Sequence, residues 1–271
     1  MRGGTKASRI RVSGILAWIG LAVAVVFFVG PLVATFEFSL RLIRGQYTLE
    51  SYRAVFADPR FATAFLYSTG LALAAIVVGL ALVVPTAYFV RLRLPRMRGA
   101  VEFITLLPLV VPAIVIVFGY LRLYNSSSLL PLTDTNAGTT LLLLFGYVVL
   151  ALPYLYRSVD TGLGAIDART LTEAAETLGA RPLTILLRVI VPSILPALLG
   201  GAFLTFAIVI GEFTLASLLN QPAFGPYLQL IGANRAYEPS ALAILSFLVT
   251  WLCMGLIGLV GRWPGRPRSA R

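Results

Sequence analysis

Six long apolar segments constrain the fold of this 271-residue chain more than any other feature of its sequence. About 20 apolar residues in one α-helix cross the hydrocarbon core of a bilayer. Because that core offers no water to backbone groups, the segments must satisfy their hydrogen bonds internally, as helices do. We therefore predict an all-α integral membrane protein with six transmembrane helices, at about residues 15–36, 65–90, 101–121, 139–156, 193–219 and 240–261.

The first apolar segment follows a short basic stretch, as in a signal peptide. Its apolar run of about 22 residues is longer than a signal-peptide core, and no convincing small-residue cleavage site follows it. We predict an uncleaved first span, preceded by a cytoplasmic segment at residues 1–14. Residues 15–271 then form a single transmembrane domain.

Basic residues are spread unevenly over the predicted loops. With the N-terminus in the cytoplasm, sixteen of the 22 Lys and Arg residues lie in cytoplasmic segments and six lie outside. Cytoplasmic loops carry the excess of such residues, so both termini are predicted to be cytoplasmic. The same distribution explains the net charge of +11 as a feature of a protein surrounded by membrane lipid. No nucleic acid partner is needed to account for it.

Residue usage excludes several kinds of active site. The chain has no His, and its single Cys, Cys253, forms no disulfide within the chain. The only Lys, Lys6, lacks the glycines and the following Ser or Thr of a phosphate-binding Walker A loop. We expect a protein that is not itself an enzyme and holds no cofactor. If ATP drives it, ATP and Mg²⁺ are bound by another polypeptide.

The polar gap at residues 157–192 contains the most informative motif. Thr170 is placed to cap a short helix together with Glu173, three residues later. An apolar stripe follows at helical spacing, and Gly179 is placed to end the helix in a left-handed turn. Pro182 suits the first turn of a second helix, which leads through Pro192 into the fifth span. The stripe consists of Leu171, Ala174, Ala175 and Leu178.

The motif Glu173-Ala174-Ala175, Gly179, Val189, Val191 and Pro192 resembles the EAA loop of binding-protein-dependent ABC importer permeases. Two positions carry Val where the family often has Ile and Leu. An ordinary capped helix in a membrane-protein loop is the alternative reading. The resemblance implies the six-span permease fold, with a cytoplasmic coupling helix that docks in an ATPase subunit. The ATPase-coupling residues are then Glu173, Ala174, Ala175, Leu178, Gly179 and Pro192.

The same resemblance implies a set of partners. Two permease subunits form the translocation pathway, and the second is expected to be a related chain rather than a copy. Two ATP-binding cassette ATPase subunits bind from the cytoplasm, and an extracytoplasmic substrate-binding protein delivers the cargo. The complex is expected in the bacterial inner membrane.

Glu212 is an acidic residue in the predicted fifth span, where a charge is costly and marks a pathway or a partner by default. One reading is a negative lining for a translocated cation, with Thr205 and Tyr147 as further pathway candidates. The other is a structural carboxyl that bonds a backbone amide or an Arg and fixes helix packing.

Cargo is read from the two motif segments TEAAETLGA and GEFTLASLL, which look most like those of spermidine and putrescine permeases. Polyamine is therefore the expected cargo, with ferric iron, thiamine and phosphonate as alternatives. An ion-coupled secondary transporter is the alternative from a different class, and it would be expected to show ion-coupling residues or repeated helix breaks.

Overall fold

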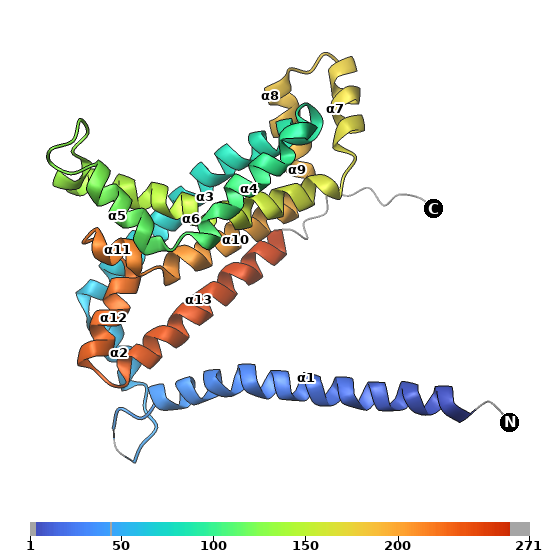
Figure 1. The fold of residues 1–271 in the computed structure, drawn as a ribbon. Helices are drawn as coiled ribbons and strands as arrows, with labels where there is room; N and C mark the ends of the chain where they lie inside the picture. The colour runs from blue at the N-terminus through green and yellow to red at the C-terminus, as the bar shows by residue number, and fades with distance from the viewer. Residues whose placement is uncertain (1–3, 44, 261–271) are drawn as a thin grey trace. The chain divides into compact units, whose positions relative to one another are not determined.

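The computed structural model of the protein describes residues 4–43 and 45–260, and these ranges contain helices and no strand. The chain divides into two compact units, one of residues 1–58 with 231–246 and one of 59–230 with 247–271. Figure 1 labels the α-helices. The elements in chain order are α1 (Gly4–Ser39), α2 (Glu50–Ala57), α3 (Pro59–Leu92), η1 (Pro95–Met97), α4 (Arg98–Val110), α5 (Ala113–Leu123), η2 (Leu132–Asp134), α6 (Asn136–Gly164), α7 (Ala168–Thr177), α8 (Pro182–Ile185), the π-helical segment η3 (Leu186–Ile190), α9 (Val191–Ser193), α10 (Leu195–Gly211), α11 (Thr214–Leu218), α12 (Phe224–Asn234) and α13 (Glu238–Val260).

The first unit is built around the end of α1. The Ser39 and Tyr52 hydroxyl oxygens are 2.8 Å apart, which ties the last turn of α1 to α2. The ring of Phe38 lies 4.8 Å from that of Tyr237. The membrane-length part of α1, Ala17–Ser39, is apolar and buries none of its window within the protein. A helix that is apolar all round and exposed is suited to lipid or to another protein chain.

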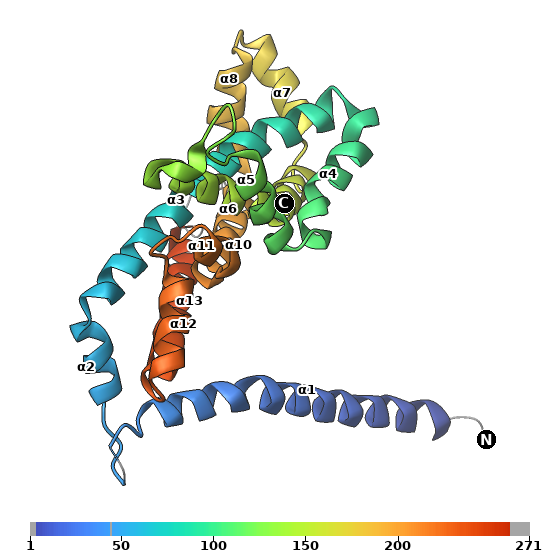
Figure 2. The ribbon, with the colours of Figure 1, turned by 60° about the vertical axis from the view of Figure 1, so that its left-hand side comes forward.

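The core of the second unit is formed by α3, α6 and α10, which lie side by side (Figure 2). Ala72 and Ala75 of α3 and Ala151 of α6 are completely buried. Small side chains at helix crossings let the backbones approach closely, which is how helices associate in lipid without a hydrophobic driving force. The three helices therefore form the scaffold on which the shorter elements are placed.

Three helices are long and apolar enough to cross a membrane: the described part of α1, α3 and α6. They coincide with the spans predicted near residues 15–36, 65–90 and 139–156, with α3 and α6 extending beyond the predicted ends. Two pairs of helices are joined at a sharp bend, and the number of candidate spans is five if each pair is counted as one span. The apolar part of α13 from Glu238 to Leu252 is shorter than a full span, and the sixth span stays a prediction.

The third and fifth predicted spans are not straight helices. The third is bent by 96° between α4 and α5. Pro112 has no amide hydrogen, and it forces Val111 into an extended conformation with ψ of 115°. The fifth span, predicted at 193–219, is bent by 80° around Ile194 and ends at Gly211. The prolines of the third span were expected to kink it, whereas the bend in the fifth span was not predicted, because hydropathy does not register a backbone break.

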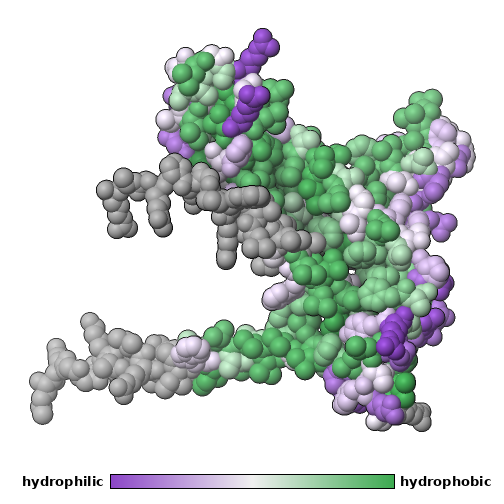
Figure 3. All heavy atoms as spheres, turned by 180° about the vertical axis from the view of Figure 1, so that it is seen from behind, coloured by the Kyte–Doolittle hydropathy of each residue, from purple (hydrophilic) through white to green (hydrophobic). Residues whose placement is uncertain are grey.

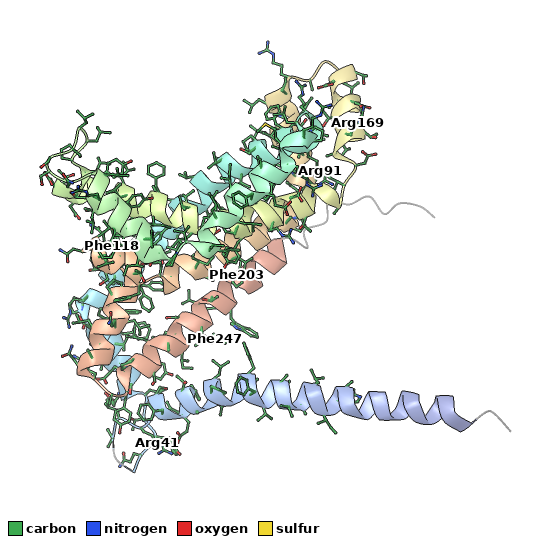
Figure 4. The ribbon with its side chains drawn as sticks, viewed as in Figure 1. Arg41, Arg91, Phe118, Arg169, Phe203 and Phe247 are labelled. Carbon is green, nitrogen blue, oxygen red and sulfur yellow. The ribbon has the colours of Figure 1, made fainter. Side chains whose placement is uncertain are left out.

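Charged residues gather at one end of the second unit. Asp160 near the end of α6 pairs with Arg91 at 3.1 Å and with Arg98 at 2.9 Å. Figure 4 labels Arg91 and Arg169 at this end, and Figure 3 shows hydrophilic residues over α7 and α8 next to a largely hydrophobic surface. The connection between α3 and α4, which Arg91 and Arg98 flank, and the predicted EAA loop therefore lie at the same end of α6. The C-terminal arginines, Arg262 to Arg271, lie outside the described residues.

Candidate functional site

The helix predicted to dock on an ATPase is α7, and it begins earlier than the capping prediction had it. Asp167 is the N-cap: its carboxylate accepts from the Thr170 amide at 3.1 Å and from the Thr170 hydroxyl at 2.7 Å. Glu173 instead accepts from Arg169 at 2.8 Å. The predicted capping box of Thr170 and Glu173 is wrong, because a better acceptor stands three residues before Thr170.

The bonds at this cap set the charge of Asp167. The Thr170 hydroxyl, and then the Thr170 amide, lower the pKa of the Asp167 carboxyl below its ordinary value. The cap therefore stabilises the folded chain above the unfolded-state pKa of aspartate. That contribution is lost as the pH falls through the lower folded-state pKa. At neutral pH the ionised carboxylate complements the positive end of the helix dipole.

The C-terminal end of α7 has the predicted glycine turn. Gly179 has φ of +78°, and its amide donates to the Glu176 carbonyl at 2.9 Å. The Ala180 amide donates to the Ala175 carbonyl at 3.0 Å. These two bonds make up a complete Schellman motif, in which only glycine adopts the left-handed position without strain. Pro182 opens α8 as predicted.

The predicted apolar stripe of α7 divides between two faces. Ala168 and Thr172 are buried and Ala175 is partly buried, at the spacing of one inward face. Leu171, Ala174 and Leu178 are exposed, and Leu178 has 89% of its surface accessible. These three apolar side chains follow one another at helical spacing. They form an outward face that no other part of the described chain covers. We call Leu171, Ala174 and Leu178 the outer stripe.

The link from α7 to α10 is less regular than a straight helix. It passes through α8, the π-helical segment η3 and α9, which contains Pro192. It then bends by 80° at Ile194, which is buried. Insertions of this π type interrupt the regular hydrogen-bond ladder and often mark functional hinges. The link reaches the start of the fifth span as expected, but through a bend.

Glu212 lies at a break rather than within a continuous helix. Its backbone is extended, with ψ of 129°, and it separates α10 from α11. Its carboxylate is buried and accepts from the amides of Leu215 at 2.8 Å and Ala216 at 3.2 Å. A carboxylate at the start of a helix stabilises the unpaired amides there. This is the amide bonding of the structural reading, and the pathway role of Glu212 stays a prediction.

The other two pathway candidates are also buried. The Thr205 hydroxyl donates to the Gly201 carbonyl of its own helix at 2.9 Å. Tyr147 on α6 is completely buried, and its hydroxyl has no hydrogen-bond partner among the described residues. Tyr147 and Thr205 thus lie away from the surface, as Glu212 does. A pathway role for Thr205 and Tyr147 stays a prediction.

An open groove of about 690 Å³ runs along α4, α6 and α10 of the second unit. It is mostly apolar, and its polar lining comes from Tyr154, Arg157, Ser158 and Thr161 of α6. Arg157 pairs with Glu102 at 3.1 Å on the exposed surface. The lining has one basic and no acidic side chain. Arg157, Ser158 and Thr161 were not predicted to line a pathway, because a polar stripe on a long apolar helix is visible only once its neighbours are known.

Gln221, which was not singled out from the sequence, is the centre of a buried polar cluster at the opposite end of α6. Its amide nitrogen donates to Asn136 at 3.1 Å and to Thr139 at 2.7 Å. Its carbonyl accepts from the hydroxyls of Tyr67 at 2.5 Å and Thr140 at 3.2 Å. Both ends of the side-chain amide are satisfied, as a buried polar group requires. The cluster joins the α11–α12 link to α3 and α6.

Comparison with known proteins decides the family. Residues 85–263 match the family described as "Binding-protein-dependent transport system inner membrane component". The chain belongs to this family. Its members include transport permeases, so the chain is a multi-pass membrane permease. Family membership favours the ABC importer class over the secondary transporter considered from the sequence.

Individual relatives agree on the class and differ in cargo. The chain is 31% identical to the molybdenum transport permease ModB of Mycobacterium tuberculosis, over 91% of this chain and 94% of ModB. It is 24% identical to the spermidine/putrescine transport permease PotB of Escherichia coli, over 76% of this chain and 79% of PotB.

Solved structures agree on the fold. A chain of the bacterial ABC transporter that imports the acidic polysaccharide alginate superimposes with a TM-score of 0.74 at 12% identity. It covers 96% of this permease and 98% of that chain. A chain of the methionine transporter MetNI gives 0.59 at 20% identity, over 76% and 96%. The protein therefore has the ABC importer permease fold.

Proposed function

We propose that this permease imports a small oxyanion of the molybdate type and is driven by a separate ATPase that docks on α7. The identity of 31% to ModB over nearly the whole chain carries the cargo proposal. The groove along α6 has one Arg in its lining, Arg157, which pairs with Glu102 at 3.1 Å and would exchange that partner for the anion. Arg presents planar paired donors that suit tetrahedral and carboxylate oxyanions.

Polyamine is the second candidate, and the similarity to PotB favours it. A polycation pathway needs exposed negative groups. The Glu212 carboxylate, the acidic residue predicted to line a cation pathway, instead accepts from the amides of Leu215 and Ala216. Phosphonate belongs to the oxyanion class, whereas ferric iron and thiamine are cationic and need the same negative lining as polyamine.

The ATPase is proposed to bind the outer stripe of α7. Leu171, Ala174 and Leu178 are apolar and exposed, and an apolar stripe on a capped helix is suited to a groove in another protein. A second permease subunit completes the pathway, and an extracytoplasmic binding protein delivers cargo. A solved alginate transporter is in complex with such a periplasmic protein.

Purification from native membranes in mild detergent tests the assembly. We expect an ATPase and a second permease to co-purify with the chain, and their masses distinguish a related permease from a second copy. Recovery of the chain alone, or only with copies of itself, in every lipid condition would contradict the importer assignment.

Uptake into vesicles that contain the purified complex, its binding protein and internal ATP tests the cargo. We expect accumulation of radiolabelled molybdate that an excess of tungstate inhibits and an excess of spermidine does not. Uptake of spermidine without uptake of molybdate would reverse the choice and support the polyamine candidate. Ferric iron, thiamine and phosphonate are tested as competitors in the same assay.

Cysteine labelling from the two sides of the membrane tests the proposed orientation. In a variant without Cys253, we expect Leu94→Cys to react only from the cytoplasmic side and Leu129→Cys only from outside. Leu94 is half exposed and Leu129 fully exposed, so both positions are accessible to a reagent. Labelling of the two positions from the same side would overturn the six-span topology.

A further inference from the structure

The inward face of α7 is joined to α3 by a buried pair of hydroxyl groups. The hydroxyl oxygens of Tyr88 and Thr172 lie 3.0 Å apart. Tyr88 is 5% exposed and Thr172 is 8% exposed, so water does not compete for this bond. Tyr88 stands in the last turns of α3 and Thr172 in the middle of α7. The pair therefore connects the docking helix directly to a membrane-length helix.

The direction of this bond follows from the second contact of Thr172. The Thr172 hydroxyl lies 2.6 Å from the Ala168 carbonyl, which can only accept. Because a hydroxyl has a single hydrogen to donate, Tyr88 must donate to Thr172. Loss of either hydroxyl breaks the same bond, and loss of the Thr172 hydroxyl also leaves Tyr88 without its buried acceptor.

Tyr88 is held firmly on its own side. It belongs to one buried cluster with residues of α6, α8 and η3, among them Val159, Ile185 and Ile190. A second contact lies about one helical turn away, where Arg93, the residue after α3, is 3.6 Å from Glu176 of α7. That ion pair is largely exposed and is expected to contribute little. The buried hydroxyl pair is therefore the principal polar tie between the two helices.

The other end of α3 carries a matching set of ties. Tyr67 donates to Gln221, and Ser68 accepts from the Phe224 amide at 2.8 Å. The 20 residues between Ser68 and Tyr88 correspond to about 30 Å of helix. The helix is continuous between the two ends, although Pro85 lies within it. It thus links the α7 end of the unit to the α11–α12 end.

We propose that Tyr88 is a positioning residue that transmits displacement of α7 to α3, in parallel with the link through Pro182 and Pro192 to α10. This inference rests on the proposed docking of an ATPase on α7. The link to α10 contains a π-helical segment and an 80° bend, both of which absorb motion. A buried bond to a continuous helix transmits displacement over a shorter and stiffer route.

The test compares transport with ATP hydrolysis in the same vesicles, which contain the complete complex and the binding protein loaded with molybdate. Tyr88→Phe removes the hydroxyl and keeps the ring. We expect about a fivefold loss of molybdate imported per ATP hydrolysed, the effect of one buried hydrogen bond on the coupling equilibrium. Thr172→Val should give a similar loss, and Thr172→Ser, which keeps a hydroxyl, should restore coupling.

Tyr156→Phe is the matched control. Tyr156 is buried in the same cluster, and its hydroxyl has no hydrogen-bond partner among the described residues. Its variant should import as much per ATP as the unmodified complex. The double variant Tyr88→Phe/Thr172→Val should import no less molybdate per ATP than the single variant with the larger loss. Both changes remove the same bond, so their effects should not add.

The failure of this inference differs from the failure of the proposed function. If the unmodified complex couples ATP hydrolysis to uptake and Tyr88→Phe does so equally well, the α3 route is overturned and the importer assignment stands. An equal loss in Tyr156→Phe also overturns it, because the effect then belongs to the cluster rather than to the bond. If the unmodified complex neither hydrolyses ATP nor takes up molybdate or spermidine, the proposed function itself fails.

Discussion

Replacing Leu178 by lysine is expected to separate the chain from its ATPase while leaving the chain folded. Leu178 is 89% exposed at the end of the outer stripe, so its side chain contributes little to the isolated subunit. Burying a leucine in a partner contributes about 1.5–3 kcal/mol, and a charge in its place must also be desolvated. We expect affinity for the ATPase to fall by roughly 10–100-fold or more. Transport should be lost with it.

Lysine is chosen because a positive charge is favourable at the C-terminal end of a helix. Leu178 is the C-cap of α7, so the substitution should not weaken the helix itself. Leu129→Lys is the matched control, since Leu129 is also fully exposed and lies at the other end of α6. Co-purification of the ATPase should be unchanged there. If Leu178→Lys retains the ATPase at the normal ratio, α7 does not dock through the outer stripe.

Replacing Gly225 by alanine is expected to destabilise the fold strongly. Gly225 lies in the first turn of α12, and a Cβ there would stand 2.2 Å from the Glu212 carbonyl oxygen and 2.9 Å from its carbon. These are backbone atoms, which cannot rotate away. We expect a cost of about 3 kcal/mol, at the upper end of ordinary overpacking. The melting temperature of the purified chain should fall by about 6–12 °C.

Gly211→Ala is the control for this prediction. Gly211 adjoins the same break, at the end of α10, but a Cβ there meets nothing within 4 Å. Alanine is the better helix former, so the melting temperature should be unchanged or slightly higher. Equal melting temperatures for Gly225→Ala and the unmodified chain would show that the Glu212 backbone does not pack closely against Gly225 of α12.

Features encoded locally were predicted well. Gly179 ends α7 because its turn requires a positive φ, and the two bonds that close the turn come from residues within five positions. The start of the same helix was misplaced by one turn. Asp167 and Thr170 are both good capping residues, and only the folded chain shows which of them accepts the free amides.

Breaks in the apolar segments were predicted less well. Pro112 is visible in the sequence, but whether a proline kinks a helix or ends it depends on how its neighbours satisfy the freed carbonyls. Glu212 gave no such signal. Its extended backbone lies against Gly225, and its carboxylate caps a helix of five residues that hydropathy joins to α10.

The sequence by itself determined the membrane class, the family and the glycine turn of α7, because apolar length, motif spacing and backbone conformation are properties of short stretches. Only the tertiary structure decided which face of α7 remains free and where the Glu212 carboxylate points. It also decided that Tyr88 meets Thr172, 84 residues away, and that Tyr67 meets Gln221, 154 residues away. Contacts at such separations arise from how α3, α6 and α10 pack, and no local pattern in the chain specifies them.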